Sequence, residues 1–260
     1  MTAKPANPLE MIAYVLANQI EDGEIVYIGT GLPMVAGILA KKTHAPNMTM
    51  VYESGAQNPI EGDMPWSVAG PYTWRKSPLI LEMSYSFGQL ANGYVDKAFL
   101  GYGQIDMYGN VNTHLIGESF HNYKHRLTGS GGNNDLASLA KNLVLVGLQN
   151  PQKFVKNVDF ITSVGFLTGG NSRKEAGLVG GGPSAVITSA GVYDFDPESK
   201  RMRIHSLHPG VSPELAQLAS GFELIKPEGE IPVTPVPTQE VIDILRNEVD
   251  PRGVFTSMPS

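Results

Sequence analysis

The first predicted element is an amphipathic helix. Asn7 is a suitable N-cap, Pro8 suits the first helical position, and Glu10 at the third can close a capping box. Apolar residues then recur at intervals of three and four, at Leu9, Ile12, Val15, Leu16 and Ile20. This spacing predicts a helix from Pro8 to about Asp22 that packs one face against a core.

Two continuous apolar runs on either side of a second helix predict a strand–helix–strand unit. The strands are expected at Glu24–Ile28 and Met48–Tyr52, with a helix from Pro33 to about His44 between them. A helical crossover makes such strands parallel. The Gly29–Gly31 turn and Glu53 each follow a strand directly, so we expect both at one edge of the sheet.

That edge makes Glu53 the leading candidate for a catalytic residue. Ligands of open α/β sheets bind outside the carboxyl ends of the strands, where a carboxylate can act as a nucleophile. Ser54 and Gly55 follow it and complete a Glu-Ser-Gly sequence. Carboxylates are also ordinary in turns and caps, so from this stretch alone a structural role stays open.

The remaining pattern predicts strands that alternate with short helices. Strands are expected at 79–86, 98–103, 111–116, 143–148, 160–164, 185–189, 192–195 and 202–206, and helices at 136–141, 212–221 and 238–249. Strands 98–103 and 111–116 are expected to form a hairpin around the turn 106–110, and the last three strands a β-meander. The Pro-rich stretch 56–78 is expected to be a long, functional loop.

These elements predict an α/β fold with an open, mainly parallel sheet flanked by helices and a β-meander in the C-terminal part. At 260 residues the chain could form one large domain or two small ones. Without repeats or a long linker, one domain over residues 1–260 is the simpler expectation.

Composition excludes several functional classes. A net charge of −6 argues against nucleic acid or an anionic membrane as a partner, since both require a basic face. The absence of cysteine excludes disulfides, zinc–thiolate sites and thiol catalysis. The N-terminus lacks an apolar signal core, and no apolar run approaches the ~18 residues of a membrane span. We therefore expect a cytoplasmic protein.

Three glycine clusters are candidates for anion or backbone contacts. Gly129, Ser130, Gly131 and Gly132 precede a predicted helix and leave amides unshielded, which suits an oxyanion or acyl group, or simply a flexible turn. Gly29–Gly31 lacks the third glycine of a dinucleotide fingerprint and is expected to be a tight turn before a helix whose amides favour anions. Gly180–Gly182 is expected to be structural.

The histidines do not predict a metal centre. His121 and His125 are four residues apart, but no third ligand is near in sequence, and Lys124 and Arg126 would repel a cation. No Gly-x-Ser-x-Gly nucleophile motif occurs. From composition and spacing, we expect an acyl-transfer site with a carboxylate and a glycine loop.

Three segments give the chain a clear family resemblance. They are Val51–Gly55, Gly103–Asn112 and Thr128–Gly132. With Gly29–Pro33, Thr162-Ser163 and Ile244–Pro251, the chain resembles the family I CoA-transferases in order along nearly its whole length, and most closely their glutaconate-type β subunits. The resemblance implies an open α/β subunit that pairs with a homologous α subunit, in an α2β2 or larger complex.

The resemblance also implies residue roles and a reaction. Glu53 corresponds to the catalytic glutamate, which would carry coenzyme A as a glutamyl thioester. Gly129–Gly132 would donate amides to the thioester oxygen, with Gly131 or Gly132 as the main donor. Coenzyme A is then a substrate and a covalent intermediate, exchanged between an acyl-CoA and a carboxylic or dicarboxylic acid, and no permanently bound cofactor or metal is implied.

Other functions on the same fold stay open. Ring-opening hydrolases of CoA esters resemble the chain at Gln104–Asp106, Tyr108–Asn110 and Ser206–Val211, and a related decarboxylase carries cysteine at the position of Glu53. The retained glutamate favours transfer over these alternatives. A non-catalytic subunit or ligand-sensing module is the alternative from another class.

Overall fold

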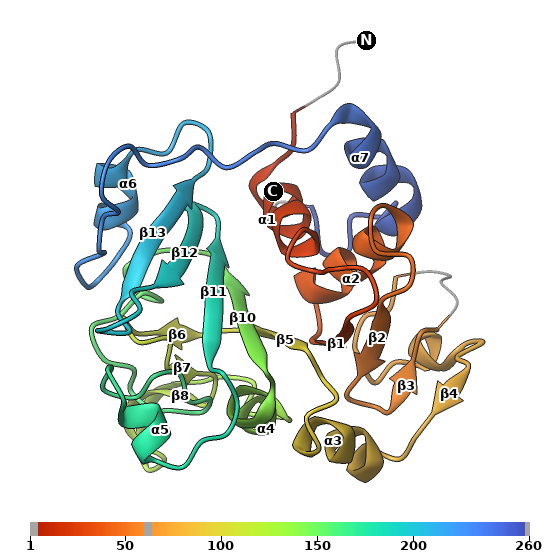
Figure 1. The fold of residues 1–260 in the computed structure, drawn as a ribbon, viewed down its shortest axis with the longest axis horizontal. Helices are drawn as coiled ribbons and strands as arrows, with labels where there is room; N and C mark the ends of the chain where they lie inside the picture. The colour runs from red at the N-terminus through yellow and green to blue at the C-terminus, as the bar shows by residue number, and fades with distance from the viewer. Residues whose placement is uncertain (1–4, 60–63, 258–260) are drawn as a thin grey trace. The chain divides into compact units, whose positions relative to one another are not determined.

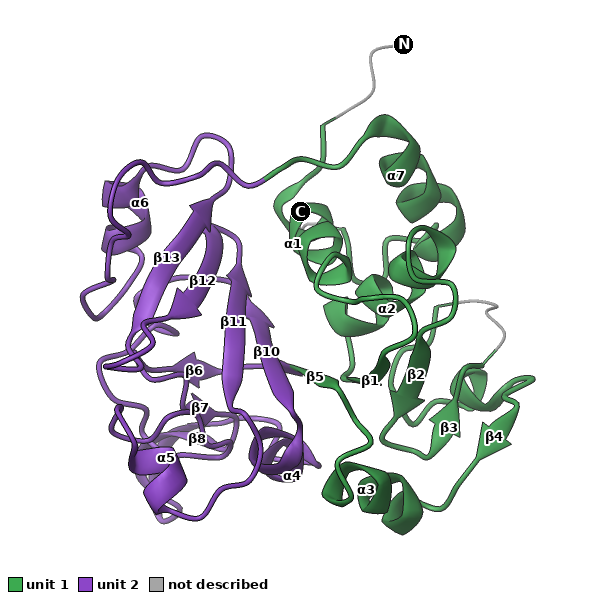
Figure 2. Cartoon of the chain, viewed as in Figure 1, with its two compact units in different colours: residues 1–99, 235–260 green, residues 100–234 purple. Residues whose placement is uncertain are grey.

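The computed structural model describes residues 5–59 and 64–257. By their internal contacts these residues form two compact units (Figure 2). Unit 1 comprises residues 1–99 and 235–260, and unit 2 comprises residues 100–234. Residues 60–63, which belong to the predicted loop 56–78, lie outside the described residues. The single domain expected over residues 1–260 stays a prediction.

Unit 1 is an α/β layer whose strands follow the order β5-β1-β2-β3-β4 (Figure 1). Strand β5 (Lys97–Gly101) begins in this unit and ends in unit 2. The other elements are α1 (Pro8–Ala17), β1 (Ile25–Ile28), α2 (Leu32–Lys42), β2 (Thr49–Tyr52), β3 (Ala56–Gln57), the 3-10 turn η1 (Pro71–Trp74), β4 (Leu79–Ile80), α3 (Met83–Ala91), α7 (Gln239–Ile244) and the π-helical turn η2 (Leu245–Val249).

Helix α1 forms for the reasons that its sequence predicts. The Asn7 side chain accepts hydrogen bonds from the amides of Leu9 and Glu10, and Glu10 Oε2 accepts one from the Asn7 amide at 2.8 Å, which completes the capping box. Arg246 of η2 binds Glu10 through two hydrogen bonds of 2.7 and 2.9 Å, so η2 is tied to the first helix. The helix ends at Ala17, about five residues before the predicted end.

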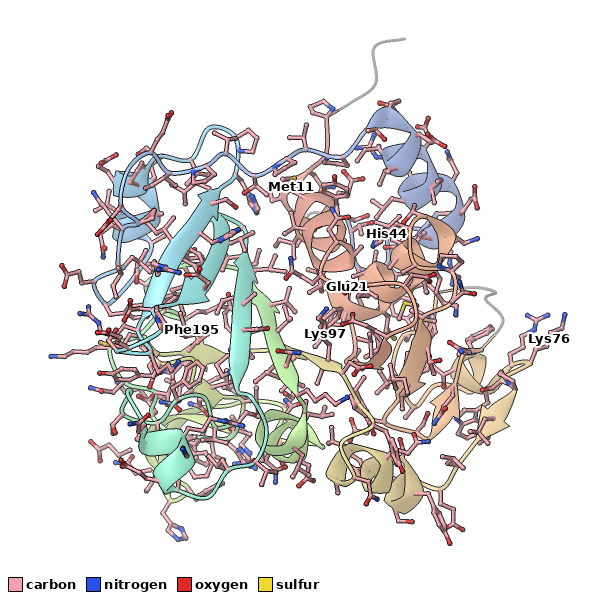
Figure 3. The ribbon with its side chains drawn as sticks, viewed as in Figure 1. Met11, Glu21, His44, Lys76, Lys97 and Phe195 are labelled. Carbon is pink, nitrogen blue, oxygen red and sulfur yellow. The ribbon has the colours of Figure 1, made fainter. Side chains whose placement is uncertain are left out.

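The central strands of unit 1 are parallel. Strand β1 pairs with β2 and with β5, and Ile28 faces Tyr52 on one side and Phe99 on the other. The amino ends of these strands carry an ion cluster, in which Lys97 Nζ lies 2.7 Å from Glu24 Oε1 and 3.9 Å from Glu21 Oε1; Lys97 and Glu21 are labelled in Figure 3. This register confirms the predicted strand–helix–strand unit.

The strand predicted at 79–86 is wrong beyond Ile80. Only Leu79 and Ile80 pair, with β3, and from Met83 the chain is helical. Ser86 and Leu90 are buried four residues apart on one helical face, and the Ser86 hydroxyl lies 3.1 Å from that of buried Tyr27. A short apolar run does not distinguish strand from helix by periodicity, so the tertiary contact decided the outcome.

Unit 2 contains the strand order β10-β11-β12-β13 and two small hairpins (Figure 1). Strands β10 and β11 are parallel, whereas β11–β12 and β12–β13 are antiparallel and form the predicted β-meander. Its elements are β6 (Gln104–Ile105), β7 (Val111–Asn112), β8 (Leu115–Ser119), β9 (Asn122–Arg126), α4 (Asn133–Leu139), β10 (Asn142–Gly147), α5 (Ser172–Glu175), β11 (Pro183–Thr188), β12 (Gly191–Phe195), β13 (Met202–Leu207) and α6 (Pro213–Leu218).

Two predicted features of unit 2 need correction. The hairpin around 106–110 is formed by β6 and β7 alone, because β5 pairs with β1 through residues 97–99. Residues 160–164 form no strand; Ser163 makes a single bridge to Val111. The polar segment His121–Arg126, for which no element was predicted, contains β9 and pairs with β8. Exposed polar strands lack the apolar alternation on which the prediction rests.

Candidate active site

Glu53 lies in a tight turn at the carboxyl edge of unit 1. The turn spans Tyr52–Gly55 and is closed by the Gly55 amide, which donates to the Tyr52 carbonyl at 2.8 Å. Because Ile28 is in register with Tyr52, the residues that follow them, Gly29 and Glu53, leave neighbouring strands at the same edge. Glu53 is half-buried, as is Ser54, whose buried hydroxyl has no hydrogen-bond partner among the described residues.

Gly55 is required by both its backbone angle and its surroundings. Its φ is +92°, a region that favours glycine, and a Cβ there would lie 1.8 Å from the Leu81 carbonyl oxygen. The Leu81 amide donates to the Gly55 carbonyl at 3.0 Å. Beyond the turn, Asn58 and Met50 exchange hydrogen bonds of 2.9 Å, which hold the returning chain against β2. The turn that carries Glu53 is thus fixed from both sides.

Helix α2 begins at the same edge. Gly31 is its N-cap, with φ +96° and no side-chain cap, and the Leu32 amide donates to no acceptor within the described residues. Thr30 Oγ1 accepts a hydrogen bond from the Val68 amide at 3.2 Å, so part of the long loop lies over the Gly29–Gly31 turn. Unshielded amides at the start of an eleven-residue helix favour an anion near Glu53.

The second candidate segment, Gly129–Gly132, belongs to unit 2. Gly129 and Gly131 adopt φ values of +98° and +49°, which turn the backbone sharply before α4. The Gly129 amide donates to the Thr113 carbonyl at 2.7 Å, and the Asn133 amide donates to Ser130 at 2.9 Å. The Ser130 and Gly131 amides donate to no acceptor in the described part of the chain. These two amides can therefore receive an oxygen atom of a ligand.

The loop rests on a polar network that fixes the chain after β7. Asn112 Nδ2 donates to Gln104 Oε1 and to the Leu115 carbonyl at 2.7 and 2.6 Å, while its Oδ1 accepts from the His114 amide at 2.9 Å. Thr113 between them is anchored by its amide, which donates to Thr162 Oγ1. The Thr113 hydroxyl is buried without a partner among the described residues. This network holds the carbonyl that anchors Gly129.

The Gly103–Asn112 segment has a structural role in the β6–β7 hairpin. Asp106 Oδ1 accepts from the amides of Tyr108 and Asn110, and Asn110 Nδ2 donates to Asp106 Oδ2 at 2.8 Å. Burial raises the pKa of Asp106, although these hydrogen bonds oppose the rise. Asn110 Oδ1 also accepts from the amides of Gly165 and Leu167. The motif thus orders the turn and the segment 165–167.

The histidines do not form a metal centre among the described residues, which contain no group of three or more His, Asp or Glu that could hold an ion. His121 and His125 are exposed in the hairpin β8–β9. His208 is buried: its Nε2 lies 2.9 Å from the Thr188 carbonyl, and its Nδ1 has no partner within the part of the chain that the structure describes. Burial lowers the pKa of His208, although the contact with Thr188 opposes this.

The sequence did not predict a role for Arg173, a residue that contacts the helix after the Gly129–Gly132 loop. It is buried in α5, and its guanidinium reaches the carbonyls of Ala137 and Ser138 in α4, the helix that follows Gly132. Nothing in the local sequence marks it, since a buried arginine in a polar segment has the same pattern as an exposed one.

A family model described as Coenzyme A transferase matches residues 9–215. The chain is 34% identical to the B subunit of glutaconate CoA-transferase from Acidaminococcus fermentans over 257 residues, 96% of this chain and 95% of that one. It is 33% identical to the B subunit of 3-oxoadipate CoA-transferase from Pseudomonas knackmussii over 238 residues, 91% of each. A cholesterol ring-cleaving hydrolase subunit of Mycobacterium tuberculosis is 24% identical over 261 residues, 94% of this chain and 95% of that one.

A solved structure agrees with these similarities. The crystal structure of glutaconate coenzyme A-transferase from Acidaminococcus fermentans superposes with a TM-score of 0.90 at 33% identity, covering 97% of this chain and 98% of that one. The predicted α/β fold class is confirmed. No helix within the described residues has the length and apolar character needed to cross a membrane.

Proposed function

This chain belongs to the coenzyme A transferase family and is a β-type subunit of such an enzyme, and from this we propose that Glu53 is the residue that carries coenzyme A during transfer. One observation supports the assignment most. The register of Ile28 with Tyr52 sets Glu53 just beyond the carboxyl end of a central strand, beside the amino end of α2. A nucleophile at that edge can meet a bound acyl group.

The proposed reaction uses only a carboxylate and hydrogen-bond donors. A Glu53 oxygen attacks the thioester carbonyl carbon, the carbon–sulfur bond breaks, and CoA thiolate leaves an acyl-glutamyl anhydride. The thiolate then attacks the glutamyl carbonyl carbon and expels the first carboxylic acid as its carboxylate. A second carboxylate repeats these steps in reverse and leaves with coenzyme A, which restores Glu53. The kinetics are therefore ping-pong.

The proposed role of Gly129–Gly132 is to bind the oxygen of the thioester carbonyl. The negative charge that develops on this oxygen is stabilised by amide donors that are already oriented. The amides of Ser130 and Gly131 have no acceptor among the described residues, which supports Gly131 as the main donor of the two glycines considered. Gly29, Gly31, Ser54 and Gly55 are proposed to shape the substrate edge around Glu53.

The proposed substrates are acyl-CoA esters and free carboxylic acids, with dicarboxylic acids preferred. This preference follows from two relatives, whose names specify glutaconate and 3-oxoadipate. The proposed partner is a homologous α subunit in an α2β2 or larger complex, since both relatives are named as B subunits. A cytoplasmic location stays a prediction.

Trapping of the covalent intermediate tests the proposal. The purified complex with its α subunit is incubated with glutaryl-CoA or glutaconyl-CoA and then with hydroxylamine or borohydride. Peptide mass spectrometry is expected to find a hydroxamate or an alcohol at Glu53, since both reagents react with a thioester. Glu53→Gln removes the nucleophile and should lower kcat about 10³-fold or more, while Glu53→Asp, which withdraws the carboxylate by one methylene, should cost about 10²-fold.

Exposed Glu240 in the first turn of α7 offers a control. Glu240→Gln should leave both kcat and the trapped peptide unchanged. An unmodified Glu53 in an active wild-type complex would contradict the proposal.

A ring-opening or thioester hydrolase is the second candidate function. It is favoured by similarity to the cholesterol ring-cleaving hydrolase subunit and by the Ser206–Val211 segment, in which His208 is buried with an unpartnered Nδ1 among the described residues. A hydrolase would release coenzyme A without a carboxylate acceptor and would incorporate ¹⁸O from labelled water into its product. A transferase would require the acceptor for turnover. A decarboxylase would release carbon dioxide.

A further inference from the structure

Arg173 is a buried cation whose side-chain hydrogen bonds within the described residues all go to the main chain. The residue is only 5% exposed, and no carboxylate of the described residues pairs with it. Its donors reach five carbonyl oxygens: Gly180 (2.9 Å), Gly165 (2.9 Å), Val164 (3.2 Å), Ala137 (2.8 Å) and Ser138 (3.3 Å). Burying a guanidinium without a counter-ion is costly, so its hydrogen bonds must compensate by organising these segments.

The carboxyl end of α4 is held by Arg173 and by the glycine segment Gly180–Gly182. The last carbonyls of a helix lack partners within the helix, and Arg173 binds two of them. The Gly180 amide donates to Ser138 at 2.9 Å and the Gly181 amide to Ala140 at 3.2 Å. A Cβ at Gly181 would lie 2.1 Å from the Lys141 carbonyl oxygen. We call Arg173, Gly180 and Gly181 the α4 clamp.

The amino end of α4 continues directly into the candidate oxyanion loop. Gly132 is its N-cap, and the Leu136 amide donates to the Gly132 carbonyl at 3.0 Å. With seven residues, α4 is too short to be stable by itself, so packing and contacts at its ends fix its position. The Gly129–Gly132 loop is therefore fixed at both ends. At one end the Gly129 amide binds the Thr113 carbonyl, and at the other Gly132 is the N-cap of α4.

We propose that Arg173 is a positioning residue for acyl transfer, which holds α4 in place and thereby directs the amides of the Gly129–Gly132 loop. This role rests on the proposed function of that loop. Arg173 acts through α4 and not on the substrate. Oxyanion donors must lie about 2.7–3.1 Å from the oxygen atom, so a small shift of α4 weakens stabilisation of the tetrahedral intermediates without removing the binding contacts of the substrate. The Gly180–Gly182 segment, which was expected to be structural, holds the same end of α4 through the amides of Gly180 and Gly181.

Three variants in the complex with the α subunit test the role. Arg173→Lys keeps the charge but loses the forked geometry, Gly181→Ala disturbs the clamp from its other side, and Lys174→Ala alters the exposed neighbour in the same helix. We expect the first two to lower kcat, and the single-turnover rate of enzyme–CoA thioester formation, by about 10–100-fold, because misplacement by about 1 Å has that effect. The KM for acyl-CoA should change less than about threefold, and Lys174→Ala should match the wild type.

Hydrogen exchange supplies a readout at the loop itself. In the Arg173→Lys and Gly181→Ala complexes, peptides that cover residues 127–139 should exchange faster, whereas peptides of the β-meander β11–β13 should be unchanged. Uniform acceleration across unit 2, or a loss of kcat that only follows the loss of folded protein, would overturn the inference. So would an Arg173→Lys subunit that fails to fold, because Arg173 would then stabilise the whole unit.

The test of the Arg173 role can fail or succeed independently of the test of the proposed thioester on Glu53. A folded Arg173→Lys complex with wild-type kcat overturns the positioning role even when the wild type forms a thioester on Glu53. A wild type that turns over without a thioester, but loses kcat on Arg173→Lys, refutes the proposed covalent step and retains the positioning role for the reaction that does occur.

Discussion

At the scale of single residues, the glycine after Glu53 and Ser54 determines where the carboxylate lies. Gly55 combines a positive φ with close approach to the Leu81 carbonyl, so the turn cannot accept a side chain there. Ser54 contributes a buried hydroxyl without a partner among the described residues, which is costly in the absence of a ligand. The turn therefore requires glycine at position 55, and folding leaves the Ser54 hydroxyl without a hydrogen-bond partner among the described residues.

Gly55→Ala is expected to impair both folding and activity. The positive φ costs about 1–3 kcal/mol for a non-glycine residue, and the contact with Leu81 adds to it because main chain must move. We expect the free energy of unfolding to fall by more than about 2 kcal/mol and kcat to fall with the displacement of Glu53. Urea denaturation and steady-state kinetics measure the two effects.

Gly23→Ala is the matched control for this variant. Gly23 has a similar φ of +87°, but a Cβ at this residue would have nothing within 4 Å of it. The substitution should cost about 1 kcal/mol and leave kcat unchanged. Equal losses in the two variants would show that the backbone angle, and not the contact with Leu81, determines the effect.

Ser54→Ala is expected to leave stability unchanged or to raise the free energy of unfolding by up to about 1 kcal/mol, since it removes a buried hydroxyl that has no partner within the described residues. Thermal unfolding of the protein with and without acyl-CoA measures the change. If the hydroxyl binds substrate, the stabilisation by acyl-CoA should be smaller in the variant. A marked loss of stability without ligand would mean that the hydroxyl is hydrogen-bonded.

At the scale of elements, the ends of helices carry specific polar contacts. Asn7 and Glu10 cap the amino end of helix α1, and Glu10 also binds Arg246 of η2. Burial by itself would raise the pKa of Glu10, but hydrogen bonds from Arg246 and the Asn7 amide and the charge of Arg246 together lower it. The first and last helical segments of the chain are therefore joined through one ionised carboxylate.

This junction predicts an acid-sensitive contribution to stability. Because the pKa of Glu10 in the folded protein lies below its ordinary value of 4.5, the contribution is present above that pH and is lost as the pH falls through the folded-state pKa. Glu10→Gln should lower the free energy of unfolding at pH 7, and its difference from wild type should shrink as the pH falls below 4.5. Urea denaturation at a series of pH values measures the difference; a pH-independent gap would contradict the role of the charge.

At the scale of the whole molecule, the chain is one subunit of an enzyme, and its surface agrees with that status. Unit 1 exposes several large apolar side chains that lie within 20 positions of one another in the sequence, including Trp66, Trp74, Ile80 and Tyr85. Large exposed apolar side chains often mark contacts with other chains. The proposed active site would take its remaining residues from such a second chain.

The isolated subunit is therefore expected to lack transferase activity. Titration with the α subunit from the same source should restore CoA transfer and saturate at a 1:1 ratio of chains. Size-exclusion chromatography with light scattering should show assembly over the same range. Full activity of the isolated chain would refute the proposed heteromeric site, and assembly without activity would refute its catalytic role.

The sequence by itself determined much of the local structure. The capping box of α1 follows from the identities of Asn7 and Glu10. The parallel strands around α2 and the β-meander follow from apolar periodicity, which acts over a few neighbouring residues. The strand–helix–strand argument also predicted that Gly29 and Glu53 share one edge, and the register of Ile28 with Tyr52 confirms it. The assignment of Glu53 as a nucleophile depended further on family resemblance and stays a prediction.

Only the tertiary structure decided the features that depend on distant residues. Residues 83–91 are helical because Ser86 and Leu90 pack into the core. Residues 97–99 of β5 pair with β1 instead of forming the expected hairpin. Arg173 lies more than 30 positions from Ala137, whose carbonyl it binds at 2.8 Å. A sequence pattern records which residues prefer burial or a turn, but it does not record which distant carbonyl a buried guanidinium will reach, because that choice is made by packing.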